Sequence, residues 1–266
     1  MIIKNHTYLT KFYLCYMKIV IIGSGNVAYH LAKAFTQNNI RVHQIYGRNE
    51  IESRKISEEF NIPFSTDKLE DADFYLISVS DSSVEQVSSL IKKENALVAH
   101  TSGSLPMGIL KGNYRKASFY PLQTFSKTKN LNYSKIPLFI EAENQIDEKS
   151  LFELASIISE NVETSDYEKR KYIHLTAVFA CNFVNHLFAR AKEISDSQDL
   201  PFDYFIPLID ETVEKIHHLE PKSAQTGPAV RGDERILKLH EELINNDEHL
   251  KIYQLMNESI KKMYHK

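Results

Sequence analysis

The sequence predicts an α/β protein: a doubly wound, mostly parallel Rossmann sheet followed by an all-helical C-terminal domain. Short apolar runs alternate with helical patterns of about 10–15 residues as far as residue 168. A glycine-rich turn, Gly23-Ser24-Gly25, ends the first run and opens a helical pattern. No strand pattern recurs after residue 168. We therefore expect an N-terminal extension at 1–16, a Rossmann domain at 17–168 and a helical domain at 169–266.

Each predicted strand is a short apolar run of the kind that is buried on both faces of a parallel sheet. The first run, Lys-Ile-Val-Ile-Ile, stops at Gly23, and the second stops at Gly47. We predict strands at 18–22, 41–46, 74–79, 96–100, 117–120, 137–140 and near Val162. Helical periodicity predicts helices at 26–37, 50–60, 82–91 and 148–159, and in the C-terminal domain at 169–195, 204–219, 233–243 and 250–263.

Composition is that of an ordinary globular protein. The 266 residues include 32 basic and 35 acidic side chains, so the formal net charge is −3, which gives no general attraction to nucleic acid or an anionic membrane. Two cysteines without metal-ligand spacing argue against a disulfide framework and for a reducing, cytoplasmic compartment. No apolar run reaches the about 18 residues of a membrane span. Residues 1–16 lack a signal-peptide core, so we interpret them as an extension or as a start codon assigned too early.

The glycine-rich turn has the pattern Gly-x-Gly-x-x-Ala of a dinucleotide-binding loop. The first glycine permits a tight turn, the second lets the backbone approach a pyrophosphate, and the small alanine lets the helix pack on the strand. The helix N-terminus offers free N–H groups to the phosphates. The alternative is a simple strand-to-helix turn, but the flanking strand and helix favour nucleotide binding. The predicted cofactor-binding residues here are Gly23, Ser24, Gly25, Asn26, Val27 and Ala28.

The end of the second strand favours NADP over NAD. An NAD site carries an acidic residue there for the ribose 2′-hydroxyl, whereas NADP needs a cation for its 2′-phosphate. This strand ends Tyr46-Gly47-Arg48-Asn49 with no acid. We predict that Arg48 and Asn49 bind the cofactor, with a solvated surface arginine as the alternative for Arg48. Glu50 comes one residue later and fits the first turn of a helix.

Two further strand ends should border the nicotinamide, because ligands bind beyond the carboxyl ends of parallel strands. Ser80, Ser102 and Gly103 are predicted to contact the cofactor. Asp81 either faces the same site or caps the helix that follows. His100 is predicted to contact substrate, with a core histidine bonded to the backbone as the alternative.

At this point the chain resembles the Rossmann-like oxidoreductases whose C-terminal half is the helical domain of unknown function 2520. These proteins are distant relatives of pyrroline-5-carboxylate reductase and 6-phosphogluconate dehydrogenase. The segments that carry the resemblance are Gly23–Ala28, His100–Ser104, Tyr120–Phe125, His174–Asn182 and Thr226–Asp233. The resemblance implies NADP-dependent redox chemistry and a homodimer built through the helical domain, and it leaves the substrate open.

Hydride transfer to a carbonyl or imine also needs a proton donor. Many dehydrogenases of related fold carry a lysine on the first long helix of the second domain, but Val178–Asn182 contains none. We predict His174 and Asn182 as catalytic residues. A regular helix would place His174 and Asn185 within about 20° of each other, and Asn182 about 80° away but still within reach of the same cleft. The alternative is a hydrogen-bonded helix interface.

Arg231 and Gln123 complete the predicted substrate site. Arg231 lies in a loop with two glycines and a proline, where it could clamp an anion, or instead pair with Asp233. No zinc signature appears, so no metal is predicted. The sequence thus predicts an enzyme that moves hydride between NADPH and a small polar, anionic carbonyl or imine. The alternative is a non-catalytic, NADP-binding regulatory protein, which the missing lysine motivates.

Overall fold

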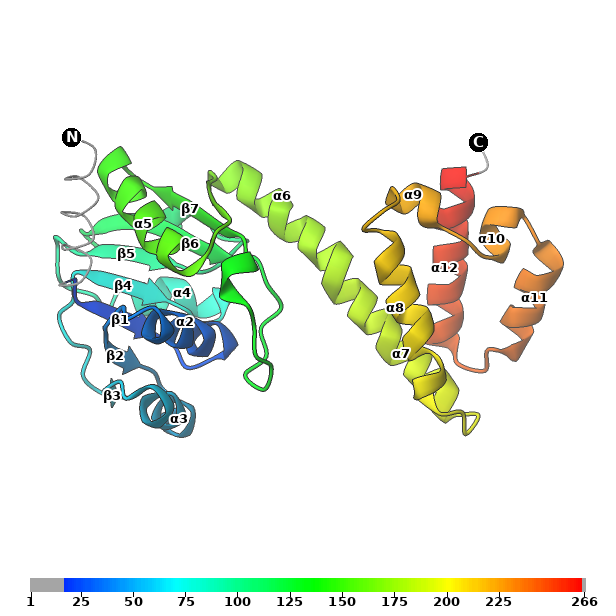
Figure 1. Cartoon of the computed structure of the whole chain (residues 1–266), viewed down its shortest axis with the longest axis horizontal. Helices are drawn as coiled ribbons and strands as arrows, with labels where there is room; N and C mark the ends of the chain where they lie inside the picture. Colours follow the sequence, from blue (N-terminus) through cyan, green and yellow to red (C-terminus); the bar gives the residue numbers. More distant parts are fainter. Residues whose placement is uncertain (1–16, 265–266) are drawn as a thin grey trace. The chain divides into compact units, whose positions relative to one another are not determined.

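The computed structural model describes residues 17–264, and the predicted extension at 1–16 lies outside them. The chain forms two compact units, Met1–Cys181 and Asn182–Lys266 (Figure 1). Each unit is described separately below. The first contains the Rossmann sheet, and the second is helical.

The first unit is built on an eight-stranded sheet in the order β3-β2-β1-β4-β5-β6-β7-β8. Neighbouring strands are parallel except for β6 and β7, which pair antiparallel. This arrangement confirms the predicted doubly wound, mostly parallel sheet. The strands are β1 (Ile19–Ile22), β2 (Val42–Tyr46), β3 (Phe64–Ser65), β4 (Phe74–Ile77), β5 (Leu97–His100), β6 (Arg115–Pro121), β7 (Leu138–Ala142) and β8 (Val162–Thr164).

Two apolar clusters cover the two faces of the sheet. Side chains from α2 (Asn26–Gln37), α3 (Glu50–Phe60) and α5 (Gln145–Ile158) pack with one cluster, which includes Ile19 and Ile21 of β1. Side chains near α4 (Asp81–Ser88) pack with the other, which includes Val20 and Ile22. Successive residues of β1 therefore point to opposite covered faces, which explains its uninterrupted apolar sequence.

Helix ends are predicted well where a cap or a glycine marks them. The helices predicted at 26–37 and 50–60 have these same bounds in the structure. The helix after β4 begins at Asp81, and Ser80 takes the N-cap position, so the capping alternative for Asp81 is wrong by one residue. The two-residue strand β3 was not predicted, because two residues carry no periodicity.

The long helical pattern predicted at 169–195 is interrupted by a π-helical segment. Helix α6 (Tyr167–Ala177) leads into π-helix Val178–Phe183 and then into α7 (Val184–Asp196). A π-helix bonds residues five apart, so the regular rotation that placed His174 and Asn185 on one face does not hold across it.

The two units divide between Cys181 and Asn182, later than the predicted division at 168/169. The reason is that the start of α6 packs with the sheet. The Arg170 side chain is fully buried, pairs with Glu141 of β7 and donates to the Leu105 carbonyl at 2.7 Å.

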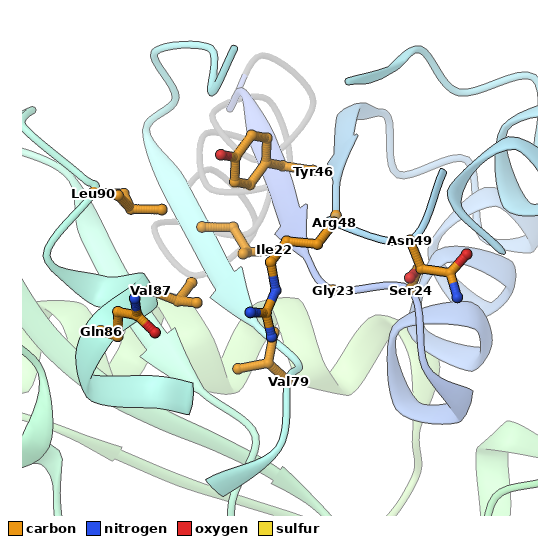
Figure 2. A pocket seen from close by; sticks show the side chains of 11 residues that line it. Ile22, Gly23, Ser24, Tyr46, Arg48, Asn49, Val79, Gln86, Val87 and Leu90 are labelled. Carbon is orange, nitrogen blue, oxygen red and sulfur yellow. The ribbon is translucent and has the colours of Figure 1, made fainter. Parts of the chain in front are cut away.

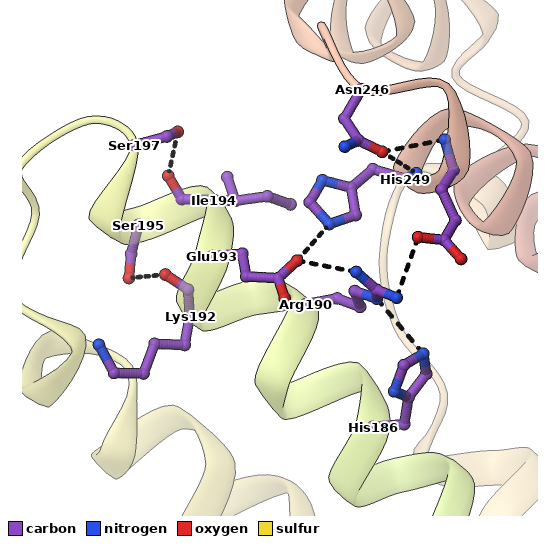
Figure 3. A network of polar contacts seen from close by, with 10 residues as sticks. His186, Arg190, Lys192, Glu193, Ile194, Ser195, Ser197, Asn246 and His249 are labelled. Atoms are coloured by element: carbon purple, nitrogen blue, oxygen red, sulfur yellow. Dashed lines mark hydrogen bonds and ion pairs between the residues drawn. The ribbon is translucent and has the colours of Figure 1, made fainter.

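The second unit consists of helices joined by short turns. The helices after α7 are α8 (Ile206–Lys215), α9 (Pro221–Ala224), α10 (Pro228–Arg231), α11 (Glu234–Leu243) and α12 (Asp247–Tyr264). A polar network joins α7 to α12 (Figure 3): Glu193 accepts from Arg190 and from His249, each at 2.9 Å, and Arg190 also pairs with Glu248. No helix within residues 17–264 is both long and apolar enough to cross a bilayer.

Candidate nucleotide and hydride-transfer site

The turn between β1 and α2 has the geometry of a phosphate-binding loop. Gly23 has a φ of +130°, and a Cβ placed there would lie 2.2 Å from the Ser78 carbonyl oxygen, so only glycine fits. Gly25 is the N-cap of α2, and a Cβ placed on it would meet no atom within 4 Å. The first turn of α2 contains no acidic residue and its cap makes no side-chain hydrogen bond. These features leave the N-terminus of α2 open to an anionic group.

The remaining loop residues fit the same arrangement. Ala28 is fully buried in the cluster between α2 and the sheet, as the small third position of the motif requires. Val27 packs against that cluster. The Asn26 side chain donates to the Phe125 carbonyl at 2.8 Å, so Asn26 fixes a neighbouring segment and is not directed only at a ligand.

A pocket of about 330 Å³ lies beside this loop (Figure 2). The side chains of Ile22 on β1, Val87 on α4, Tyr46 on β2, and Val79 and Leu90 form a largely apolar surface that suits a purine ring. Arg48 also lines the pocket, and Figure 2 shows its side chain extending into it. The lining residues are Ile22, Gly23, Ser24, Tyr46, Gly47, Arg48, Asn49, Val79, Gln86, Val87 and Leu90.

No acidic side chain lines this pocket, and its cation is Arg48. Among residues 17–264 no ion pair or side-chain hydrogen bond of Arg48 is found, so its guanidinium is available to an anion. Asn49 is the N-cap of α3, and its side-chain oxygen accepts from Glu52 N at 3.1 Å. A pocket with a cation and no carboxylate fits a phosphorylated ribose better than a free 2′-hydroxyl. The residues present therefore fit NADP.

Ser80 follows β4, and Ser102 and Gly103 follow β5; the three residues differ in how far they are exposed. Ser80 is exposed and its hydroxyl lies 3.0 Å from that of Ser83. The Ser102 hydroxyl accepts from Ser104 N at 3.0 Å, and Ser102 is half-buried. Gly103 is buried, and its contact with the cofactor stays a prediction.

Gly103 instead lets two polar side chains approach the strand end. A Cβ on Gly103 would lie 2.7 Å from the Tyr120 ring and 2.8 Å from His174 Cβ. The Tyr120 hydroxyl lies 3.0 Å from His174 Nδ1, and the two rings meet edge to face. Burial raises the pKa of Tyr120 to about 12, while the positive charge of Arg170 acts in the opposite direction. Tyr120 is therefore a neutral phenol at neutral pH.

Tyr120 was not among the predicted site residues. It lies at the end of β6, within a segment that carries the family resemblance, but no spacing in the sequence links it to His174. His174 was predicted, and the structure gives it a polar partner on the sheet. This Tyr120–His174 pair is the strongest acid–base candidate of the first unit.

His100, predicted to contact substrate, is a core histidine. Its side chain has no exposed surface, and its Nδ1 accepts from Ser102 N at 3.2 Å. His100 is the last residue of β5, and its burial matches the core-histidine alternative, while a contact with substrate stays a prediction. Burial lowers the pKa of His100 to about 4, the charge of Arg170 lowers it further, and the Pro106 carbonyl partly offsets both.

This buried histidine should make the stability of the protein depend on pH. An unfolded histidine titrates near 6.5, so between pH 6.5 and 4 the unfolded chain takes up a proton that the folded chain does not. The contribution of His100 to the free energy of unfolding is therefore fully present above pH 6.5, and about 3 kcal/mol of it is lost as the pH drops to 4. Urea unfolding across this range should show a smaller decline for His100→Asn, which keeps an acceptor for Ser102 N. Equal declines in the two proteins would contradict the assignment.

The other predicted substrate residues are not brought together within one unit. Gln123 is exposed, and its side-chain oxygen accepts from Thr124 N at 2.8 Å. Asn182 and Arg231 belong to the second unit and are exposed. Asp233 caps α11 by accepting from Ile236 N, and within the described chain it forms no ion pair with Arg231. Residues 17–264 contain no group of three His, Cys, Asp or Glu side chains suited to a metal ion.

The sheet, the glycine loop and the acid-free pocket define an NADP-binding oxidoreductase. Residues 18–102 match the family model of coenzyme F420-dependent NADP oxidoreductases, and residues 136–260 match domain of unknown function 2520. The chain belongs to the family of NADP oxidoreductases that joins these two parts.

Solved structures support this membership. A Bacteroides fragilis protein classed as an NADP oxidoreductase shares 40% identity with a TM-score of 0.88, over 94% of this chain and 99% of that one. A Thermotoga maritima protein shares 20% identity (TM-score 0.78, 93% and 100% covered), and 1-pyrroline-5-carboxylate reductase from Streptococcus pyogenes shares 14% (TM-score 0.60, 92% and 98% covered). The last two likenesses show the fold alone. No curated protein sequence matches the chain.

Proposed function

We propose that this NADP-dependent oxidoreductase transfers hydride between NADPH and a small polar, anionic carbonyl or imine. The observation that carries the proposal is the Tyr120–His174 pair held against Gly103 at the carboxyl edge of the sheet. Ligands bind at this edge in open α/β sheets, so the pair belongs to the region where the reacting carbon would lie.

NADPH supplies the hydride in this reaction, and the protein must supply a proton to the substrate oxygen or nitrogen. We assign that proton to the His174 imidazolium. When protonated, His174 donates from Nδ1 to the Tyr120 hydroxyl oxygen and keeps Nε2–H for the substrate. After Nε2 has lost its proton, the neutral ring keeps Nδ1–H and still donates it to the Tyr120 oxygen, so the ring keeps its orientation in both states. Tyr120 thus acts as a positioning residue for His174.

The anionic character of the substrate is proposed from Arg231. This exposed side chain ends α10, between Gly227, which has a φ of +113°, and Gly232, which has a left-handed conformation. A guanidinium without an ion pair among the described residues is suited to a carboxylate or phosphate. Asn182, His100 and Gln123 have weaker support: Asn182 is exposed in the π-helix, and Gln123 already bonds to Thr124.

The test is NADPH oxidation with matched carbonyl and imine compounds, each with and without a carboxylate. We expect turnover with carboxylate-bearing compounds, and a loss of about 100-fold or more in kcat for His174→Gln. Tyr120→Phe should lose less, about tenfold, and should leave NADPH affinity unchanged. Unaltered kcat in His174→Gln would remove the assigned proton donor. A preference for uncharged compounds would remove the anionic substrate class.

We also propose that a second copy of the chain covers the helical unit. Many large apolar side chains of this unit are exposed, far more than isolated surface residues require. They include Ile194, Leu200, Tyr204, Leu208, Val213, Ile216, Leu243 and Leu255. Light scattering should give the mass of a dimer, and Leu208→Glu should reduce it to that of a monomer; a monomeric wild type would overturn the proposal. A cytoplasmic location, which cell fractionation can check, fits the free thiol of Cys181.

A further inference from the structure

The segment between β6 and β7 replaces the crossover helix that a parallel pair would need. Residues 122–135 of this segment lie along α2 and are fastened to it at three points. Asn26 donates to the Phe125 carbonyl at 2.8 Å, and Lys33 donates to Asn130 at 2.8 Å. Between them, His30 bonds to the segment at both ring nitrogens. Because residues 26, 30 and 33 share one helix face, the segment is held over several turns of α2.

His30 fixes the segment in one position. Its Nε2 lies 2.9 Å from the Ser126 carbonyl, which can only accept, so Nε2 carries the proton. Its Nδ1 then accepts from the Tyr133 hydroxyl at 2.7 Å. Burial lowers the pKa of His30, which favours this neutral form. The Phe125 ring packs on the His30 ring with centroids 5.1 Å apart. A segment anchored this closely presents its intervening side chains in a defined place.

The side chain presented at this place is Lys127. Its ammonium donates to the Ser24 carbonyl of the glycine loop at 2.8 Å and pairs with Glu52 in the first turn of α3. Only 24% of the Lys127 side chain is exposed. The ion pairs with Lys127 and with Lys55 hold the pKa of Glu52 at about 2, so Glu52 is a carboxylate at neutral pH. Lys127 thus joins the N-terminal regions of α2 and α3 from a strand connection far away in the sequence.

These contacts place Lys127 beside Ser24, at the edge of the pocket that Arg48 also lines. Ser24 lines that pocket, and so does Asn49, which accepts from the N–H of Glu52 (Figure 2). A 2′-phosphate carries more than one negative charge, and Arg48 alone supplies one positive charge. Glu52 would repel such a phosphate unless a cation neutralised it.

We propose that Lys127 is a second cationic ligand of the NADP 2′-phosphate and so determines the preference for NADP over NAD. In the structure its ammonium bonds to the Ser24 carbonyl and to Glu52, and an ammonium has three donors. The third donor is left for the phosphate, while the pair with Glu52 cancels the charge that would repel it. Residues 122–135 then contribute to the cofactor site through Lys127. This inference rests on NADP use and not on the proposed substrate or proton donor.

The competing explanation is that Lys127 only ties residues 122–135 to α3 through Glu52. The two explanations differ for Glu52→Gln. If the Lys127–Glu52 ion pair only holds the segment in place, Glu52→Gln and Lys127→Met should weaken the binding of NADPH and NADH alike. If Lys127 binds the phosphate, Glu52→Gln should leave NADPH binding equal or tighter, because a repelling charge is removed.

The experiment is calorimetric binding of NADPH and NADH to four variants, each checked for an unchanged melting temperature. We expect Lys127→Met to weaken NADPH binding about 10- to 100-fold and NADH binding less than about threefold. Lys33→Met is the matched control. The Lys33 ammonium, like that of Lys127, lies 5.9 Å from the Tyr29 ring centroid, and it bonds to Asn130 of the segment. It should change either affinity by less than about threefold. Arg48→Ala provides the reference for loss of a phosphate cation.

Three results would overturn the proposal. One is unchanged NADPH affinity in Lys127→Met while Arg48→Ala weakens it, which leaves NADP use intact. Another is equal weakening of NADPH and NADH, which places Lys127 at a phosphate common to both. The third is weakening of both cofactors by Glu52→Gln as well, which makes the pair a structural tie. If the wild type bound neither cofactor, the NADP assignment itself would fail together with this inference.

Discussion

Gly23→Ala should destabilise the protein by about 3–6 kcal/mol, whereas Gly25→Ala should change its stability by less than about 0.5 kcal/mol. The same methyl group is added two residues apart. At Gly23 it would meet the Ser78 carbonyl oxygen at 2.2 Å on a backbone with a φ of +130°. At Gly25 it would meet nothing within 4 Å, and the φ of −76° is open to any residue. Thermal unfolding followed by circular dichroism measures both.

NADPH affinity should be sensitive to the substitution that leaves stability unchanged, Gly25→Ala. The methyl of Gly25→Ala occupies the space through which a pyrophosphate reaches the N-terminus of α2, so affinity should fall at least about tenfold in a fully folded protein. Normal NADPH affinity in Gly25→Ala would mean that the pyrophosphate does not approach this backbone. A normal melting temperature for Gly23→Ala would mean that β1 and β4 can separate to admit a methyl group.

The nucleotide half of the site could be predicted from the sequence because its signals are local. The glycine loop, the helix that follows and the acid-free end of β2 lie within thirty residues, and each position has a steric or electrostatic reason. The bounds predicted from helical periodicity agree with those of α2 and α3, which have Gly25 and Asn49 at their N-cap positions.

The rest of the site depends on contacts that no local pattern encodes. Tyr120 and His174 are 54 positions apart, and Lys127 reaches residues 103 and 75 positions away. The stretch around Lys127 is polar and without periodicity, so it reads as an ordinary loop. The burial of His100 could not be predicted for a related reason: a residue at a strand end can point inward or outward, and only tertiary packing decides which. The π-helix likewise has no sequence signature that periodicity would detect.

Arg170→Met should cost about 3–5 kcal/mol, because it leaves Glu141 as an unpaired carboxylate that is largely removed from water. The Arg170 side chain has no exposed surface and that of Glu141 is 16% exposed. The Leu105 carbonyl would lose its donor as well. Denaturant unfolding measures the loss, and the double variant Arg170→Met/Glu141→Leu should regain a substantial part of it. Lys171→Met removes the exposed pair with Glu168 and should leave the denaturant midpoint nearly unchanged.

Arg170→Met should also lower kcat much more than it lowers NADPH affinity. Arg170 lies one helical turn before His174 on α6, and its bonds to β7 hold that turn against the sheet. Loosening it should disturb the 3.0 Å contact between His174 and Tyr120, whereas the glycine loop draws its support from β1, β2 and β4. We therefore expect kcat to fall by more than tenfold while NADPH affinity changes by less than about threefold. If affinity fell as far as kcat, α6 would be supporting the nucleotide loop as well, and His174 would lose its separate role.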